Sequence, residues 1–343
     1  MANHTMYTRA YSERSAGKLV SGKRPNGYPL SPTALLEEFR NHSVKSNPVA
    51  TALVSCSDRI VDTLTRAFAK HYQEGESKAD IWIAFIEVPP TTNETATLIH
   101  FAEVLAARCK RISEVLAEEC KLRDPKFYSH EVVFEWAIPK EYVVHEVSLE
   151  TLMKRGLQKH HFLPPSPPKV QPSTMDVRCY NARQFQQQDP WETGVFLGFF
   201  ARTFGARAPL NWISYRLFYD CVWAKIVGDD EVRLKYEHEE HIETVDFKFL
   251  CDLDDGINTS LYDWWLSDID FLGYEDWRDV TEDKIAWDLI ELWETWHDVG
   301  CDGTVKELST KEKLSYDRAK NELLLEYEKE KAAIEAEAVR IGL

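Results

Sequence analysis

An arginine, two serines and a glutamate stand in order in the first half of the chain, each within or beside an apolar, strand-like run: Arg9, Ser55, Ser57 and Glu131. A carboxylate stabilises the oxocarbenium-like state through which a glycosidic bond breaks. A guanidinium pairs with two phosphate oxygens at once, and a serine hydroxyl orients such groups without filling a pocket. The set predicts cleavage of the nicotinamide–ribose bond of NAD, with Glu131 at the sugar and Arg9 on the pyrophosphate.

Hydrophobic spacing predicts the elements that position these residues. After Ser57, apolar residues recur at helical spacing as far as residue 72, with Ser57 as the N-cap. The run 81–88 is nearly all apolar and stops at two prolines, as a strand covered on both faces does. We expect a helix over 91–121, opened by a capping box at Thr91 and Glu94, and two last strands at 131–137 and 142–147.

The order and setting of these residues resemble the arginine-serine-glutamate class of mono-ADP-ribosyltransferases, typified by the A subunits of cholera toxin and heat-labile enterotoxin. The similar region runs from Tyr7 to about Met153, and enterotoxin-like domains of this kind are also found in fungal proteins. The resemblance implies an α+β fold, an ADP-ribosyltransferase-like split sheet with a helical insert, and NAD as substrate in its central cleft. It also implies that Arg9, Ser55 and Ser57 contact or structure the NAD site and that Glu131 is catalytic.

One position departs from this family. Members that modify arginine have a second glutamate two residues before the catalytic one, and other members have a glutamine; here the residue is Ser129. The activity that we expect is therefore NAD hydrolysis or transfer of ADP-ribose to an unknown intracellular acceptor, a protein or a small molecule. Glu135 is a rival to Glu131, because positions 131, 133 and 135 of one strand share a face. His130 would face away from Glu131.

Prolines mark the division of the chain into parts. We expect an NAD-binding domain over 1–162 and a proline-rich linker over 163–175. A mainly α-helical, tryptophan-rich second domain follows over 176–304, and a long charged amphipathic helix over 305–343. The tryptophans that we expect in the core of the second domain are Trp264, Trp265, Trp277, Trp287, Trp293 and Trp296.

The last helix carries an apolar stripe, which either packs along the second domain or engages another chain. Its members are Tyr316, Ala319, Leu323, Tyr327, Ile334, Ala338 and Ile341. Self-association through this helix is the second reading of the stripe. Within the second domain we expect helices over 191–204 and 210–226, and alternating strands at 232–236 and 245–249.

Composition limits the partners. A formal net charge of -16 argues against general nucleic-acid binding. The seven cysteines are scattered without a C-x-x-C pair, His238 and His241 lack the order of a zinc protease, and the acidic run 252–256 lacks the last ligand of a calcium loop, so we expect no metal. Neither a signal-peptide core nor a transmembrane run is present, so we expect a soluble cytoplasmic protein with free thiols.

Two functions of different classes fit the sequence. The first is an NAD-dependent ADP-ribosyltransferase or NAD glycohydrolase. The second is a catalytically inactive relative that serves as an interaction or regulatory module. Release of nicotinamide from NAD separates them.

Overall fold

The chain folds into two compact units, Met1–Phe204 with Ala208–Asn258, and Gly205–Arg207 with Thr259–Leu343. The structure is a computed structural model. It describes residues 5–15, 17–23, 28–44, 49–89, 98–116, 122–165, 172–228, 230–262, 269–297 and 308–341.

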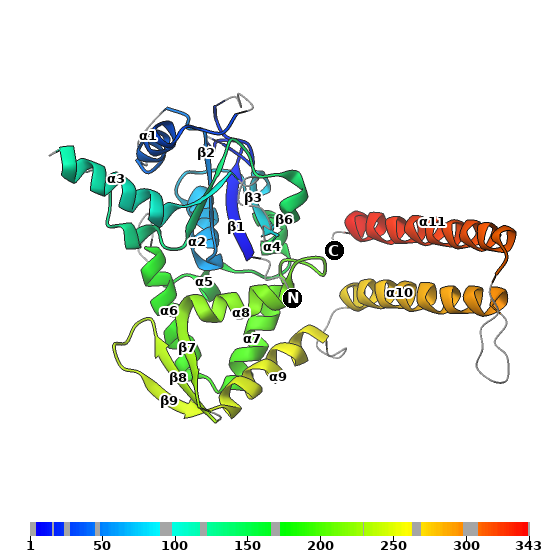
Figure 1. The fold of residues 1–343 in the computed structure, drawn as a ribbon. Coiled ribbons are helices and arrows are strands. Elements are labelled where there is room, and N and C mark those ends of the chain that lie inside the picture. Colours follow the sequence, from blue (N-terminus) through cyan, green and yellow to red (C-terminus); the bar gives the residue numbers. More distant parts are fainter. Residues whose placement is uncertain are drawn as a thin grey trace. The chain divides into compact units, whose positions relative to one another are not determined.

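The first unit is built on a six-stranded antiparallel sheet with the order β4-β5-β2-β1-β3-β6 (Figure 1). Its strands are β1 (Thr5–Ser12), β2 (Leu53–Ser57), β3 (Ile81–Val88), β4 (Ile99–Phe101), β5 (Glu131–Glu135) and β6 (Val143–Ser148). β1 pairs with β3 along its whole length, whereas β1 and β2 are paired only at Thr8 and Ser57. The sheet is therefore joined weakly in the middle, between β4–β5–β2 and β1–β3–β6.

Successive side chains point to opposite faces of the sheet, and each face packs into its own hydrophobic core. On one face, Leu53 and Val133 pack with helices α1 (Pro32–His42) and α3 (Ala102–Leu116). On the other face, Val54, Cys56, Val132 and Phe134 pack with Tyr7, Ala84 and Ile86 of the neighbouring strands. A strand that buries both faces has few polar positions, which is why 81–88 is nearly all apolar.

The predicted mixed α+β class is confirmed, and so are several elements of the first half. The strand over 81–88 is β3, the strand at 142–147 is β6, and the helix after Ser57 is α2 (Ile60–Tyr72). The helix expected over 91–121 was placed wrongly at its start: residues 99–101 form β4, which pairs with Val132, Val133 and Phe134 of β5. Thr91 and Glu94 lie outside the described residues.

A helical layer follows the sheet in the same unit. It contains the short helices α4 (Leu149–Lys154) and α5 (Lys159–Phe162), then α6 (Thr174–Gln187), α7 (Pro190–Arg202), α8 (Leu210–Cys221) and α9 (Lys248–Tyr262). Between α8 and α9 lies a second sheet of β7 (Val222–Val227), β8 (Glu231–Tyr236) and β9 (Glu243–Asp246), in that order. The helix expected over 210–226 thus ends at Cys221, and the strand expected at 245–249 ends at Asp246.

Two glycines let α7 and α9 cross closely. A Cβ on Gly194 would lie 2.2 Å from the Leu253 carbonyl oxygen, and a Cβ on Gly256 would lie 2.2 Å from that of Trp191. Any larger side chain would force the helices apart. The acidic run 252–256 is therefore a helical segment packed on α7, and not a metal-binding loop.

The helical layer is part of the first unit, although the sequence suggests a second domain from 176. Asp220 of α8 accepts a hydrogen bond from the Val61 main-chain N–H at 3.0 Å, and so caps the first turn of α2. Phe185 of α6 and Phe218 of α8 pack against each other, with ring centroids 6.0 Å apart. The units divide near residue 259 instead of at 163–175; residues 166–171 of that segment lie outside the described residues.

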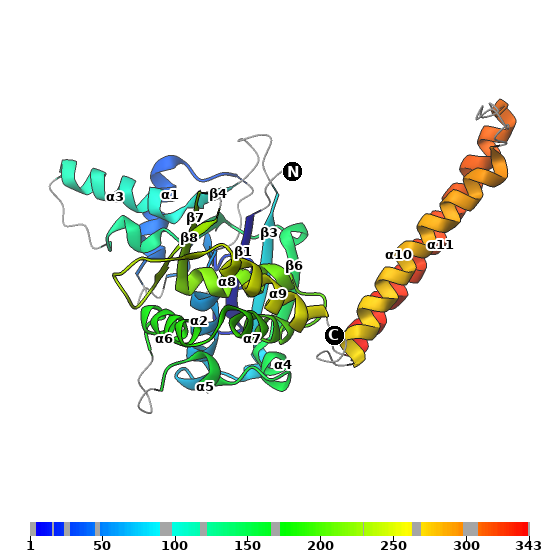
Figure 2. The same ribbon diagram turned by 90° about the horizontal axis from the view of Figure 1, so that it is seen from below.

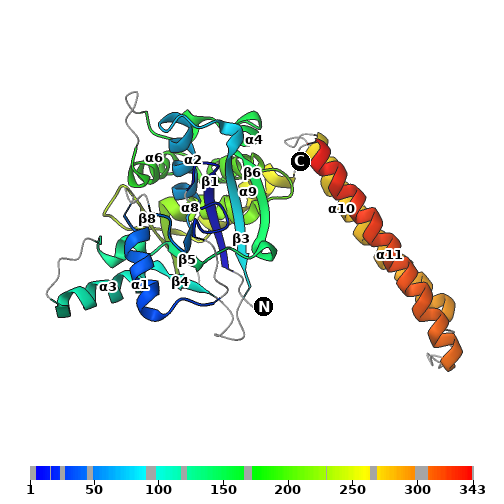
Figure 3. The same cartoon turned by 90° about the horizontal axis from the view of Figure 1, so that it is seen from above.

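The second unit contains an antiparallel helical hairpin of α10 (Ile269–Trp296) and α11 (Thr310–Ile341), which lie side by side (Figures 1–3). Lys284 and Glu330 form an ion pair at 3.0 Å, and the rings of Trp296 and Tyr316 are 6.4 Å apart. Tyr316, the first member of the stripe on α11, therefore packs on α10. Trp287 and Trp293 are 69% and 37% exposed, so their assignment to the core was wrong. Trp264, Trp265 and the side chain of Trp277 lie outside the described part of the chain.

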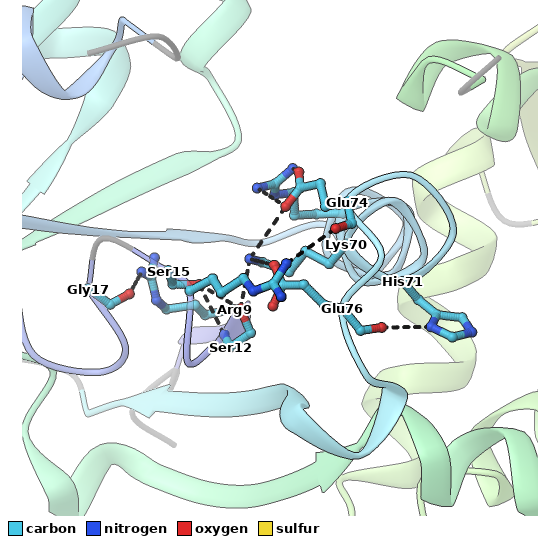
Figure 4. Close-up of polar contacts among 10 residues, drawn as sticks. Arg9, Ser12, Ser15, Gly17, Lys70, His71, Glu74 and Glu76 are labelled. Carbon is cyan, nitrogen blue, oxygen red and sulfur yellow. Dashed lines mark hydrogen bonds and ion pairs between the residues drawn. The ribbon is translucent and has the colours of Figure 1, made fainter. Parts of the chain in front are cut away.

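A buried ion pair fixes the end of β1 to α2. Lys70 Nζ donates to Ser12 Oγ at 2.9 Å and to Glu76 Oε1 at 3.1 Å, and Lys70 and Glu76 are both buried (Figure 4). Burial alone would raise the pKa of Glu76, but hydrogen bonds from Ser12 and Lys70 outweigh it and hold this pKa below its ordinary value. The pair thus supports folding at neutral pH and loses its contribution in acid.

We predict that Lys70→Met destabilises the protein by about 3 kcal/mol, because it leaves a buried carboxylate without its cation. The double substitution Lys70→Met with Glu76→Leu should recover most of the loss. Unfolding in urea measures both. Lys154→Met, which breaks the exposed pair with Glu150, is the matched control and should cost less than about 1 kcal/mol. Equal losses for Lys70→Met and Lys154→Met would contradict the role of burial.

Candidate functional site

The residues singled out in the sequence meet where the sheet is joined weakly. Arg9 lies on β1, Ser55 and Ser57 lie on β2, and Glu131 opens β5, so three neighbouring strands carry them. Glu131 is opposite Ser57 in the β2–β5 register. The fold therefore gathers four residues that lie up to 122 positions apart in the sequence, from 9 to 131.

Arg9 bridges this joint with its guanidinium. Nη1 donates to the Ser55 carbonyl oxygen at 2.5 Å, Nη2 donates to that of Gly17 at 2.6 Å, and Nε donates to that of Lys18 at 2.7 Å. Gly17 lies in a tight turn, where a Cβ would come 2.8 Å from the Val20 carbonyl oxygen. Arg9 thus holds the loop after β1 against β2. Three of its five N–H groups therefore bond to main-chain carbonyl oxygens.

Glu131 is a carboxyl group that titrates near neutral pH. Burial raises the pKa of Glu131 to about 7, and the nearby carboxylate of Asp62 adds to this effect. A hydrogen bond from the Ser55 side chain and the positive charge of Arg9 act in the opposite direction. Serine, arginine and glutamate are therefore electrostatically coupled, and a pKa near 7 is the value that suits a group exchanging protons at that pH.

Ser57 has a different local role from the one predicted. Helix α2 begins at Ile60 with Arg59 as its N-cap, and Ser57 Oγ accepts a hydrogen bond from the Arg59 main-chain N–H at 3.0 Å. Ser57 therefore closes the turn between β2 and α2. The capping group of α2 is Asp220, from the helical layer.

A polar network that the sequence did not predict supports the start of β5. His130 Nδ1 lies 2.9 Å from Asp58 Oδ1, and the Asp58 main-chain N–H donates to the His130 carbonyl oxygen at 3.1 Å. Arg216 of α8 reaches Asp58 at 3.5 Å and donates to Asp220 at 2.7 Å. Burial raises the pKa of Asp220 to about 7. The only signal in the sequence was a charged residue, Asp220, among the apolar positions of α8.

The two secondary candidates fall into structural settings. Glu135 is 4% exposed; its Oε2 accepts from the Leu30 N–H at 2.7 Å, and its Oε1 lies 2.7 Å from His100 Nε2. It occupies the opposite end of β5 from Glu131. Ser129 is exposed and ends a 3-10 helix, Pro125–Tyr128, so it precedes the strand instead of lying on it.

Within the described part of the chain, no group of three or more histidine, cysteine and acidic side chains could hold a metal ion. His238 lies 3.0 Å from Gln186 Oε1 in a turn after β8. Among the helices that the structure describes, none combines the length and the apolar character needed to cross a membrane.

Comparisons of this chain with protein-family models, with curated proteins and with solved structures find no match. The site must therefore be judged on its own geometry.

We predict that Glu131→Gln stabilises the fold at alkaline pH and changes it little in acid. Because the folded-state pKa of Glu131 is raised, its contribution to stability is complete below its unfolded pKa and is lost as pH rises through about 7. The gain above pH 8 should reach up to about 3 kcal/mol, and urea unfolding at pH 5 and pH 8.5 measures it. Glu141→Gln, at an exposed position, is the control. If Glu131→Gln changes the free energy of unfolding by the same amount at pH 5 and at pH 8.5, the raised pKa of Glu131 is refuted.

Proposed function

We propose that this chain cleaves the nicotinamide–ribose bond of NAD, as an ADP-ribosyltransferase-like protein that transfers ADP-ribose or hydrolyses NAD. The observation that carries the proposal is the coupling of Glu131 to the Ser55 hydroxyl and the Arg9 charge at the weak joint of the sheet. The order of these residues along the chain is the one on which the resemblance rests.

In this proposal Glu131 acts as a carboxylate at the sugar. As the glycosidic bond breaks, its electron pair leaves with nicotinamide and positive charge develops on the ribose, which an adjacent carboxylate stabilises. The Ser55 hydroxyl orients the carboxylate through its hydrogen bond. Arg9 keeps the loop at Gly17 in place, and its positive charge attracts the pyrophosphate oxygens. The oxygen of water or of an acceptor hydroxyl then forms a bond to the ribose carbon, and its proton passes to the solvent.

The acceptor side favours hydrolysis, or an acceptor other than arginine. Ser129 is exposed just before β5 and has no carboxylate with which to take a proton from a guanidinium. Asp58 is engaged with both His130 and Arg216.

The described cysteines are free thiols, which fits a reducing compartment such as the cytoplasm: Cys56, Cys109, Cys179, Cys221 and Cys251.

A specific observation favours the second candidate, an inactive interaction module. Three nitrogens of Arg9 are already bonded to main-chain carbonyl groups, so the residue has a structural role without any ligand.

We predict that the protein releases nicotinamide from NAD and that Glu131→Gln lowers the rate at least about 100-fold, because it removes the charge that stabilises the transition state. The rate should fall as pH drops below about 7, where Glu131 takes up a proton. Chromatographic measurement of nicotinamide checks both expectations.

Glu135→Gln is the matched control, since its amide oxygen can still accept from Leu30 and it lies at the other end of β5. Its turnover should stay within about threefold of the unchanged protein, well inside the loss expected for Glu131→Gln. If the unchanged protein releases no nicotinamide above the Glu131→Gln background and calorimetry detects no NAD binding, the enzyme proposal fails and the interaction module remains.

A further inference from the structure

In the part of α10 whose side chains the structure describes, a second face is apolar and largely exposed; its last member, Trp293, also stacks on His297, with ring centroids 4.8 Å apart. Trp287, Ile290 and Trp293 are 69%, 48% and 37% exposed and follow one another at three-residue intervals, so they form one stripe. The residues of α10 that are less exposed, Leu289 and Leu292, lie on a different side of the helix. We call Trp287, Ile290 and Trp293 the tryptophan stripe.

Two helices cannot bury such a stripe by themselves. In α11, the face with Tyr316 is already used on α10 of the same chain. Leu314 and Leu325 are exposed, at 66% and 59%, and share another face of α11 because eleven residues make about three turns. Amphipathic helices gain most of their stability from packing their apolar faces, and contiguous exposed apolar surface marks interaction sites.

The charges around the tryptophan stripe indicate which surface packs on it. The described C-terminal half of α10, residues 283–296, carries four acidic side chains, Asp283, Asp288, Glu291 and Glu294, against one basic side chain, Lys284. The N-terminal part of α11, residues 310–320, carries four basic side chains, Lys311, Lys313, Arg318 and Lys320, against two acidic ones, Glu312 and Asp317. The surface that complements the stripe in both charge and apolar content is thus α11 of another copy.

We propose that the chain forms a homodimer in which the tryptophan stripe of each α10 packs on the N-terminal half of α11 from the second copy. Two-fold symmetry makes the same contact twice and closes a four-helix bundle, so no apolar face is left to propagate a filament. The dimer seam is therefore the outer face of the hairpin, whereas the face of α11 that carries Tyr316 packs on α10 of the same chain.

Sedimentation of the full chain from low to high micromolar concentration tests the proposal. We expect the unchanged chain to be a dimer. The double substitution Trp287→Glu with Trp293→Glu should raise the dissociation constant of the dimer at least about tenfold and so yield a monomer. Trp223→Glu is the matched control, because Trp223 is similarly exposed, at 48%, but lies on β7. It should leave the dimer intact, and circular dichroism confirms that the helices of each variant remain folded.

A charge exchange tests which helix covers the stripe. Glu291→Lys with Glu294→Lys should weaken the dimer, and adding Lys313→Glu with Arg318→Glu should restore it. A monomer at every concentration overturns the proposal and means that the stripe is covered within one chain. A dimer that survives the tryptophan substitutions, or weakens as much with Trp223→Glu, also overturns it. If the charge exchange does not restore the dimer, α11 is excluded as the partner helix.

Discussion

The guanidinium of Arg9 is the connection on which the first unit depends. Elsewhere in the sheet, neighbouring strands are held by main-chain ladders, but β1 and β2 pair at Thr8 and Ser57 alone. Beside that pair, one side chain bonds the carbonyl oxygens of Ser55, Gly17 and Lys18. A charged donor that serves several acceptors is stronger than a neutral bond, which lets it replace part of a ladder. The weak joint and the arginine therefore depend on each other.

The helical layer contributes to this arrangement because its side chains contact residues next to the joint between β1 and β2. Asp220 caps α2, and Arg216 links Asp220 to Asp58 and so to the residue before Glu131. Burying acidic groups such as Asp220 and Glu131 costs folding free energy unless hydrogen bonds and cations compensate. Placing such groups beside one joint is typical of functional sites, where stability is given up for chemistry.

Much of the first half could be predicted from the sequence because its signals are local. β3 is an apolar run of strand length, and α2 shows helical spacing from its first turn. The helix α1 was missed although Ser31 and Pro32 form an ordinary helix start. The three-residue strand β4 has no pattern of its own and exists because β5 needs a partner.

What the sequence could not supply is long-range pairing. α8 passes into β7 between Cys221 and Val222 without a proline or glycine, so apolar spacing continues across a change of structure. The contact of Asp220 with Val61 joins residues 159 positions apart, and periodicity carries no information on it. Arg9, Ser55 and Glu131 were found by residue type and order, whereas the hydrogen bonds of Arg9 to the main chain could be known only from the fold.

The limited pairing of β1 with β2 has one more consequence. Strand edges normally lie at the outer limits of a sheet, where their free N–H and C=O groups invite another chain to pair. Here the Thr8–Ser57 pair lies at the last residue of β2, so the rest of β2 runs beside β1 in the middle of the sheet without a ladder between them. A side chain, Arg9, reaches the Ser55 carbonyl oxygen where a neighbouring strand would otherwise donate a main-chain N–H, so an edge inside the sheet is satisfied without an added strand.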